Sequence, residues 1–181
     1  MPLLKSNQFN ADDYWNLPDG VRAELIGGQL FDLAPPSRVH QRISMGLSIA
    51  FSDYIRAHDG KCEVYAAPFA VNLNADDETF VEPDVSIVCD SSKLTEKGCK
   101  GAPDLVVEIV SPSSRHMDYS TKNALYSDAH VREYWIVDPE KNRSTIYRYE
   151  EDAAPVIIPF DQPVESGIFK GLQVVVETLL P

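Results

Sequence analysis

The stretch GAPDLVVEIVSPSS, residues 101–114, joins a strongly apolar run to a single charge. The residues from Leu105 to Val110 predict a strand that is buried on both faces, yet Glu108 stands in the middle of it. A carboxylate in an apolar interior costs several kcal/mol unless it is protonated, paired or bound to a metal. The strand therefore predicts that another part of the chain supplies a partner for Glu108.

Strand-like and helical stretches alternate on either side of this strand, with polar turn residues between them. The expected elements are, in order, one or two helical turns after Asn10, a hairpin around Gly27 and Gly28, a helix capped by Ser37 and ending near residue 58, strands within 61–73 and 79–90, the strand 104–110, a helix capped by Asp118 and ending near residue 129, and a hairpin formed by 132–138 and 144–149. The C-terminal stretch 166–180 fits either a strand or a short helix. This order predicts an α/β (α+β) fold, a mixed β-sheet flanked by helices, with an N-terminal hairpin.

The length, composition and charge of the chain limit the number of domains, the kinds of ligand and the location that can be expected. A chain of 181 residues, 44% of them hydrophobic, predicts one domain, residues 1–181, with its own core. The net charge of -12 opposes long-range attraction to nucleic acid or to an anionic membrane, so a phosphate-bearing substrate has to be held locally. The N-terminus lacks a signal-peptide pattern and no run reaches the length of a membrane span, which predicts a cytoplasmic protein without a membrane partner.

The cysteines are Cys62, Cys89 and Cys99. Their number is odd, and they show neither a CxxC spacing nor neighbouring histidines that would indicate a zinc site. We expect all of them to be reduced and mostly buried.

A second acid on a strand can meet Glu108. Asp84 lies in VEPDVSIV, residues 81–88, and the polar connection 90–103 is long enough for the two strands to return side by side. If they pair, the two carboxylates converge, and converging carboxylates require a shared proton or a bound cation. Mg²⁺ accepts such hard oxygen ligands and keeps several of its waters.

Three strings of this sequence resemble the Uma2 family of restriction-endonuclease-like proteins, in the PD-(D/E)XK nuclease superfamily. They are AELIGGQLFDLAPPSRVHQRIS, VEPDVSIVCD and GAPDLVVEIVSPSSRHMDYSTKNALYSDAHVREYWIVDPEKN. The resemblance runs from about residue 14 to the C-terminus. It implies a mixed-sheet core flanked by helices and a metal-dependent phosphodiesterase site.

The resemblance assigns roles to five residues. Asp84 matches the acid of the second motif and Glu108 the acid of the third, both as metal ligands. The usual lysine two residues after that acid is absent, since position 110 is Val110, and Lys122 on the following helix matches the position to which it is transferred. Glu24 and His40 match further polar positions that the family directs toward the site, as catalytic or outer-shell groups.

Four of these residues also have a structural interpretation. Glu108 can be bonded to the backbone or to an arginine, Asp84 can be turn chemistry after proline, and Lys122 can be a surface lysine paired with Asp118. His40 lies on the apolar stripe of its helix and can be a core or capping histidine. Asp104, after a second proline, we interpret as loop chemistry, and Trp135 and Tyr134 as core residues.

Two functional hypotheses result. The first is an endonuclease that uses Mg²⁺, or Mn²⁺, to hydrolyse phosphodiester bonds in DNA, with a homodimer as a plausible way of cutting two strands. The alternative is a non-catalytic protein of the nuclease fold that binds nucleic acid or a partner protein. The missing lysine at Val110 and the acidity of the chain favour the alternative, and the pattern of Asp84, Glu108 and Lys122 favours the enzyme.

Overall fold

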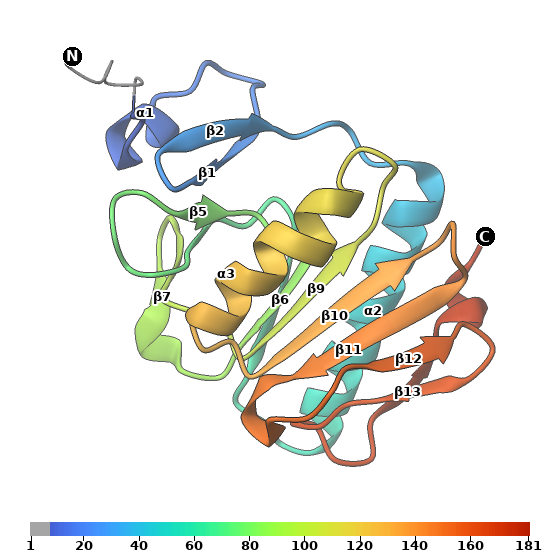
Figure 1. The fold of residues 1–181 in the computed structure, drawn as a ribbon. Coiled ribbons are helices and arrows are strands. Elements are labelled where there is room, and N and C mark those ends of the chain that lie inside the picture. The colour runs from blue at the N-terminus through green and yellow to red at the C-terminus, as the bar shows by residue number, and fades with distance from the viewer. Residues whose placement is uncertain (1–7) are drawn as a thin grey trace.

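The computed structural model describes residues 8–181, and its strands form two large sheets (Figure 1). Residues 1–7, which belong to the N-terminus where no signal peptide is expected, lie outside the described residues. In the first sheet the strand order is β2 (Gln29–Asp32), β1 (Ala23–Ile26), β5 (Phe80–Val81), β4 (Val71–Asn72), β8 (Gly98–Lys100) and β7 (Leu94–Thr95). In the second it is β12 (Val156–Pro159), β11 (Arg143–Arg148), β10 (Glu133–Asp138), β9 (Leu105–Ile109), β6 (Val85–Val88) and β3 (Glu63–Ala66).

The second sheet is mixed. Its strands β9 and β10 run parallel, whereas β6 pairs antiparallel with β9. The central strands β6, β9 and β10 are buried along their whole length, as expected for apolar runs covered on both faces. A small third sheet pairs β13 (Pro163–Glu165) with β14 (Gln173–Val175).

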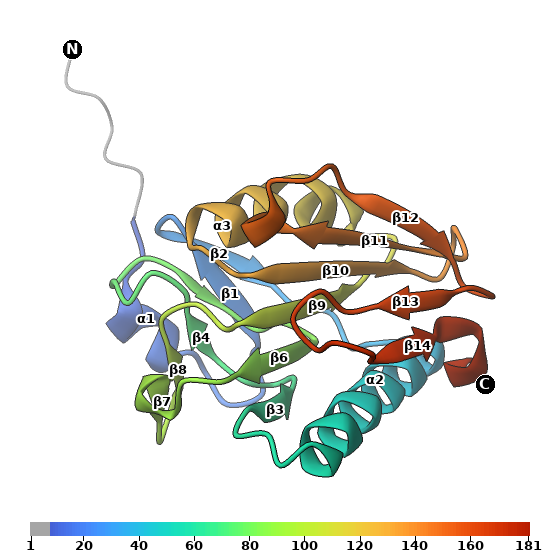
Figure 2. The ribbon, with the colours of Figure 1, turned by 90° about the horizontal axis from the view of Figure 1, so that it is seen from below.

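The helices cover both faces of the second sheet. Figure 2 shows α2 (Arg38–Ala57) on one face, with α3 (Asn123–Asp128) on the other. A π-helical segment, η2 (Met117–Lys122), leads directly into α3. The remaining helical turns are α1 (Ala11–Trp15), η1 (Ser91–Lys93), η3 (Tyr149–Glu151) and η4 (Val176–Leu179). Among the described residues, no helix combines the length and the apolar character needed to cross a membrane.

Apolar clusters fill the space between these layers. The buried stripe of α2, which includes Ile43, Leu47 and Phe51, packs on the second sheet, where Phe51 meets Trp135 at 5.3 Å between ring centroids. A second cluster on the other face joins α3 to both sheets through Tyr126 and its neighbours. The spacing of apolar residues along α2 is that of an amphipathic helix, which explains its position against the sheet.

Most of the elements expected from the sequence are confirmed. The fold class is confirmed, and so are the β1–β2 hairpin, the Asn10 and Ser37 caps and the burial of Trp135 and Tyr134. The strand-like stretch 61–73 divides at Ala67–Pro68 into β3 and β4, which belong to different sheets. The connection 90–103 carries η1, β7 and β8, and the C-terminal stretch contains both a strand and a helical turn.

Two expectations are wrong. Asp118 does not cap the helix, because the chain is already helical at residue 115 and the Asp118 side chain turns inward, where it accepts a hydrogen bond from Ser114 Oγ. Cys62 and Cys89 are not reduced but form a disulfide, because the antiparallel register of β3 and β6 places them opposite each other with Cα atoms 3.9 Å apart. Cys99 is a buried free thiol, as expected.

Candidate functional site

The pairing of β6 with β9 brings the two strand-borne acids together. Val85 lies opposite Val107, so Asp84 and Glu108 are the next residues of the same antiparallel ladder. Oδ2 of Asp84 accepts a 2.7 Å hydrogen bond from the backbone N–H of Ile109. The predicted convergence of these carboxylates is therefore observed, and Asp84 is fixed by the strand that carries Glu108.

Glu108 is paired with side chains of the π-helical segment and of α3. Its Oε1 accepts hydrogen bonds from Lys122 Nζ at 2.8 Å and from the Tyr126 hydroxyl at 2.6 Å, and the residue is only 4% exposed. Burial raises the pKa of Glu108 well above its ordinary value, and the nearby charge of Lys122 opposes that rise. Neither a backbone bond nor an arginine accounts for this acid.

Lys122 is a buried cation that joins two acids from different sheets. Its Nζ lies 2.8 Å from Oε1 of Glu108 on β9 and 2.8 Å from Oε1 of Glu24 on β1. Burial lowers the pKa of Lys122, but the combined attraction of Glu108, Glu24 and Asp118 outweighs it and raises this pKa well above its ordinary value. The interpretation of Lys122 as a surface lysine paired with Asp118 is wrong.

Glu24 is held in place from the first sheet. It is buried on β1, and its Oε1, which contacts Lys122, also accepts a 2.9 Å hydrogen bond from the backbone N–H of Glu82. The hairpin thus delivers a second carboxylate to the ammonium group, as the family resemblance implies for a residue directed toward the site.

His40 completes the set of predicted residues. It lies in the first turn of α2, with Nε2 at 3.1 Å from Oδ2 of Asp84. Its Nδ1 is buried and forms no hydrogen bond with the described residues. His40 is therefore neither a capping residue nor part of the apolar core, and it contacts an acid of the site directly.

The sequence-based prediction missed Asp118 and Tyr126. Asp118 is 2% exposed, and burial, its largest influence, raises its pKa to about 6. Asp118, Lys122 and Tyr126 recur every four residues, a spacing that places side chains on one face of a helix, and all three are buried. The regular spacing of two charged residues and a tyrosine was the feature of the sequence from which this polar helix face could have been predicted.

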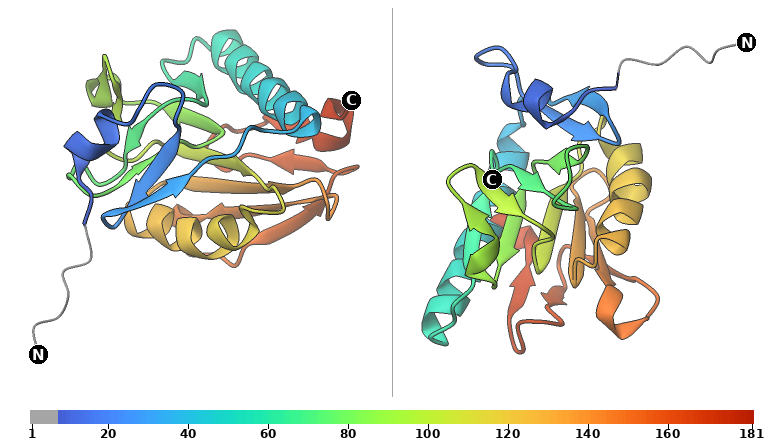
Figure 3. Two further views of the ribbon diagram at one scale, coloured as in Figure 1. Left: turned by 90° about the horizontal axis from the view of Figure 1, so that it is seen from above. Right: turned by 90° about the vertical axis from the view of Figure 1, so that its left-hand side faces the viewer.

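All five predicted residues line one cleft of roughly 770 Å³. The cleft lies between the β1–β2 hairpin, the start of α2 and the loop that follows β9. Figure 3 shows the linker that leads from β2 across to α2, and residues 33–37 of this linker line the cleft. Its charged lining is mostly acidic: Glu24, Asp32, Glu82, Asp84, Glu108, Asp118 and Glu140 stand against Arg22 and Lys122. An acidic cleft of this kind favours cations and repels an unaccompanied phosphate.

The donors in the cleft fit Mg²⁺ better than a metal that requires a full set of protein ligands. Among residues 8–181, no three His, Cys, Asp or Glu side chains are arranged to hold a metal ion. Asp84 and Glu108 each use one oxygen for the contacts described, and Asp84 Oδ1 and Glu108 Oε2 accept no hydrogen bond from the described residues. Two carboxylate oxygens, with waters or phosphate oxygens for the other positions, are typical of protein-bound Mg²⁺.

Asp104, which like Asp84 follows a proline at the entry to a strand, does not line the cleft. Its Oδ2 accepts a 2.7 Å hydrogen bond from the backbone N–H of Cys89, and its Oδ1 lies 3.2 Å from Arg132. This acid shapes the entry to β9, as expected. The Pro-Asp pairs that precede β6 and β9 thus differ in position, because Asp84 lines the cleft and Asp104 does not.

Comparison with known proteins gives consistent matches. The Uma2 family, described as "Putative restriction endonuclease", matches residues 11–177. Two Synechocystis sp. proteins are similar: "Uncharacterized protein slr1290" is 25% identical over 88% of this chain and 84% of its own length, and "Uncharacterized protein sll1609" is 24% identical over 65% and 66%. A crystal structure of "a putative nuclease belonging to DUF820" from Anabaena variabilis superposes with a TM-score of 0.75, at 18% identity, over 94% of this chain and 97% of that one. This last similarity shows a shared fold.

Proposed function

The chain belongs to the Uma2 family, and from that premise we propose that it is a metal-dependent endonuclease that hydrolyses phosphodiester bonds in DNA. The observation that carries the proposal is the buried Lys122–Glu108 pair beside Asp84 at the base of the cleft. A lysine on a helix next to two converging strand-borne acids supplies the groups of the family pattern even though Val110 replaces its usual lysine.

The metal we propose is Mg²⁺, which Mn²⁺ can replace. The free oxygens of Asp84 and Glu108 are the groups that would hold it. A divalent ion bound there supplies a lowered pKa for bound water and stabilises charge on the phosphate. The acidity of the cleft supports this assignment, because without a cation the cleft would repel a phosphodiester.

Lys122 acts as a fixed cation rather than as a base. Its raised pKa keeps the ammonium protonated at neutral pH, so it can donate a hydrogen bond to a phosphate oxygen or to the attacking water. Glu24 holds Lys122 in place, and the rigid strand β1 fixes Glu24 in turn. His40 positions Asp84 through the contact of its Nε2 with Oδ2.

We propose that the protein acts in the cytoplasm and that a homodimer presents two clefts to the two strands of a duplex. A symmetric pair of sites is a common solution for two-strand cleavage. Light scattering of the purified protein, alone and with duplex DNA, tests the dimer, and fractionation of cells that express a tagged chain tests the location.

The decisive experiment measures cleavage of supercoiled, linear and single-stranded DNA with Mg²⁺ or Mn²⁺, against EDTA. The parent protein is compared with Asp84→Asn, Glu108→Ala and Lys122→Ala, after circular dichroism has shown that each variant is folded. Asp104→Asn is the matched control, since it alters the other Pro-Asp acid at a position outside the cleft. We expect metal-dependent cutting that all three site variants lose and the control keeps.

Two results would contradict this proposal. Cutting by Glu108→Ala at the parent rate would show that the assigned site is wrong. Absence of cutting on every substrate, together with DNA binding that does not depend on metal, would favour a binding protein of the nuclease fold.

A further inference from the structure

The N-terminal half of α2 and the linker before it form the least acidic part of the chain. The protein carries 28 acidic residues, yet none lies between Leu33 and Ser52. Within this stretch Arg38 and Arg42 are both exposed, and the first turn of α2 contains no acid. A local positive surface therefore exists on a molecule whose net charge is -12.

These two arginines are unpaired, whereas the cations that line the cleft are bound by acids. Arg22 is paired with Glu82 at 2.7 Å, and Lys122 is buried between two acids. By contrast, neither Arg38 nor Arg42 forms an ion pair with any of the described residues. Their charges are available to a partner.

The position of the two arginines connects them to the cleft. Residues three and four apart lie on one face of a helix, so Arg38, Gln41 and Arg42 form a continuous surface. Gln41 lines the cleft, as do Ser37 and His40 beside it. The arginine face of α2 is therefore the rim of the cleft on one side.

The rim on the other side differs in charge. There Glu140 lines the cleft, and the nearby Arg115 is bound by Asp138, which is fully buried, and by Glu140 at 2.7 Å. Lys141, next to Glu140, is exposed and forms no ion pair with the described residues, but it stands beside that exposed acid. A polyanion that approaches the cleft meets two unpaired arginines and no acid along the start of α2, whereas the opposite rim also presents the carboxylate of Glu140.

We propose that the Arg38–Gln41–Arg42 face of α2 is the docking surface for DNA, on which the strand lies as it enters the cleft, with each arginine contacting a backbone phosphate that flanks the one to be cut. This inference rests on the proposed nuclease function and adds to it the side from which the substrate enters. Contacts of this kind set affinity and register without reading sequence.

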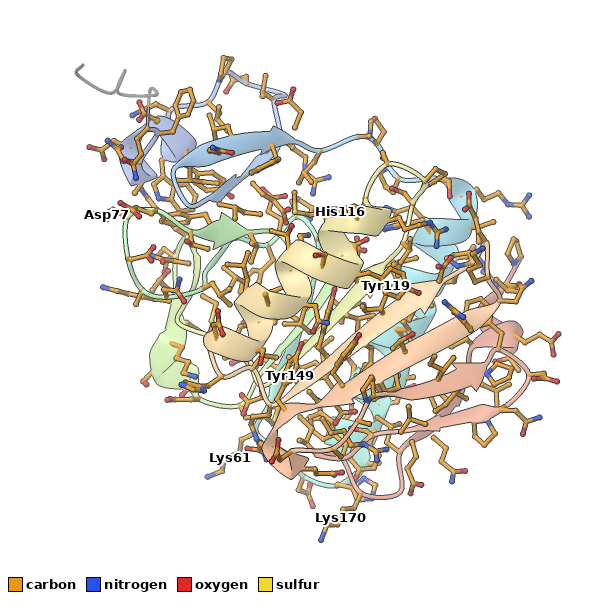
Figure 4. All side chains as sticks on the ribbon, in the orientation of Figure 1. Lys61, Asp77, His116, Tyr119, Tyr149 and Lys170 are labelled. Carbon is orange, nitrogen blue, oxygen red and sulfur yellow. A yellow bond between two sulfur atoms is a disulfide. The ribbon has the colours of Figure 1, made fainter. Side chains whose placement is uncertain are left out.

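The test measures DNA binding by fluorescence anisotropy with duplex and single-stranded oligonucleotides across a range of about 50 to 200 mM salt. Ca²⁺ replaces Mg²⁺, so that binding is followed without turnover. The variant is Arg38→Gln/Arg42→Gln, and Arg38→Lys/Arg42→Lys restores the charge. The matched control, Lys61→Gln/Lys170→Gln, removes the same charge from exposed sites that Figure 4 shows at the end of the molecule opposite the β1–β2 hairpin.

Each phosphate contact contributes about 0.9 to the slope of log affinity against log salt for a duplex and about 0.7 for a single strand. Loss of both arginines should therefore reduce the slope by about 1.8 or about 1.4, with the lysine variant close to the parent and the control unchanged. In cleavage with Mg²⁺, KM should rise while kcat is retained, because the reacting groups are untouched.

An unchanged slope and KM in the glutamine variant, in a parent protein that cuts DNA, would overturn the docking surface and leave the proposed function standing. Equal losses in the glutamine variant and the control would also overturn it, because they would indicate an effect of net charge alone. A parent protein that neither binds nor cuts DNA would refute both proposals together.

Discussion

The Tyr126 hydroxyl lies 2.6 Å from Oε1 of Glu108, and both side chains are buried. Burial raises the pKa of this phenol, so it remains a hydrogen-bond donor at any pH of interest. Because Tyr126 and Lys122 both occupy Oε1, the other carboxylate oxygen is left for a different ligand. Tyr126 thus sets the orientation of the acid that we assign to the metal.

Tyr126→Phe should lower the apparent affinity for Mg²⁺ in cleavage without disrupting the fold. Loss of a group that orients a metal ligand typically costs about 10- to 100-fold in metal affinity or activity. We expect the Mg²⁺ concentration for half-maximal cleavage to rise within that range, as a metal titration of the rate would show. Tyr134→Phe is the control, since that buried hydroxyl donates to the Asp118 backbone instead, and an equal effect there would argue against a specific role for Tyr126.

Lys122→Met should destabilise the protein strongly, because it leaves Glu24 and Glu108 as buried acids without their cation. Breaking a buried pair in this way costs about 3 to 5 kcal/mol. Urea unfolding at neutral pH measures the loss, and Glu108→Gln/Lys122→Met should recover part of it by removing one of the stranded charges. A single variant as stable as the parent would mean that the pair contributes nothing to folding.

Asp118→Asn should change how stability depends on pH. The pKa of Asp118 is raised from 3.8 to about 6 in the folded protein, mainly by burial. A raised acid pKa contributes stability that is fully present below the unfolded value and is lost as pH rises through the folded one. In EDTA, the variant should therefore match the parent below about pH 3 and exceed it by on the order of 3 kcal/mol above about pH 7. Parallel curves of unfolding free energy against pH would contradict this.

The disulfide between Cys62 and Cys89 can be tested by counting the reactive thiols of the protein. Of the three cysteines only Cys99 is free, so the denatured, unreduced protein should react with one equivalent of a thiol reagent and the reduced protein with three. The bond closes a loop with a sequence separation of 27, for which the chain-entropy relation gives about 3.5 kcal/mol. Three reactive thiols before reduction would refute the pairing.

The acidic part of the site could be predicted from the sequence because its signals are local. Glu108 interrupts an apolar strand, Asp84 begins another, and strand pairing leaves few arrangements for two buried acids. The place of Lys122 came from the family resemblance, since spacing alone indicated a surface ion pair. Its true partners, Glu24 and Glu108, depend on the packing of two sheets.

The features that the sequence did not reveal depend on register and on irregular helix geometry. The sequence suggested a helix that begins at Asp118, whereas the chain is already helical at residue 115 and passes through a π-helical segment, so Asp118 lies inside the helix and is buried. The opposition of Cys62 and Cys89 follows from the pairing of Glu63 with Val88, and a shift of one residue would separate them. The division of 61–73 between two sheets is likewise a tertiary choice.

Lys122 also links the two large sheets to each other. Glu24 belongs to one hydrogen-bonded sheet and Glu108 to the other, and a single ammonium group holds both. Heat or denaturant that separates the two sheets will move Glu24, Glu108 and Lys122 apart, while the strands within each sheet stay hydrogen-bonded to one another. Loss of activity should therefore precede global unfolding. Amide hydrogen exchange should show that the boundary between the two sheets opens as one cooperative unit.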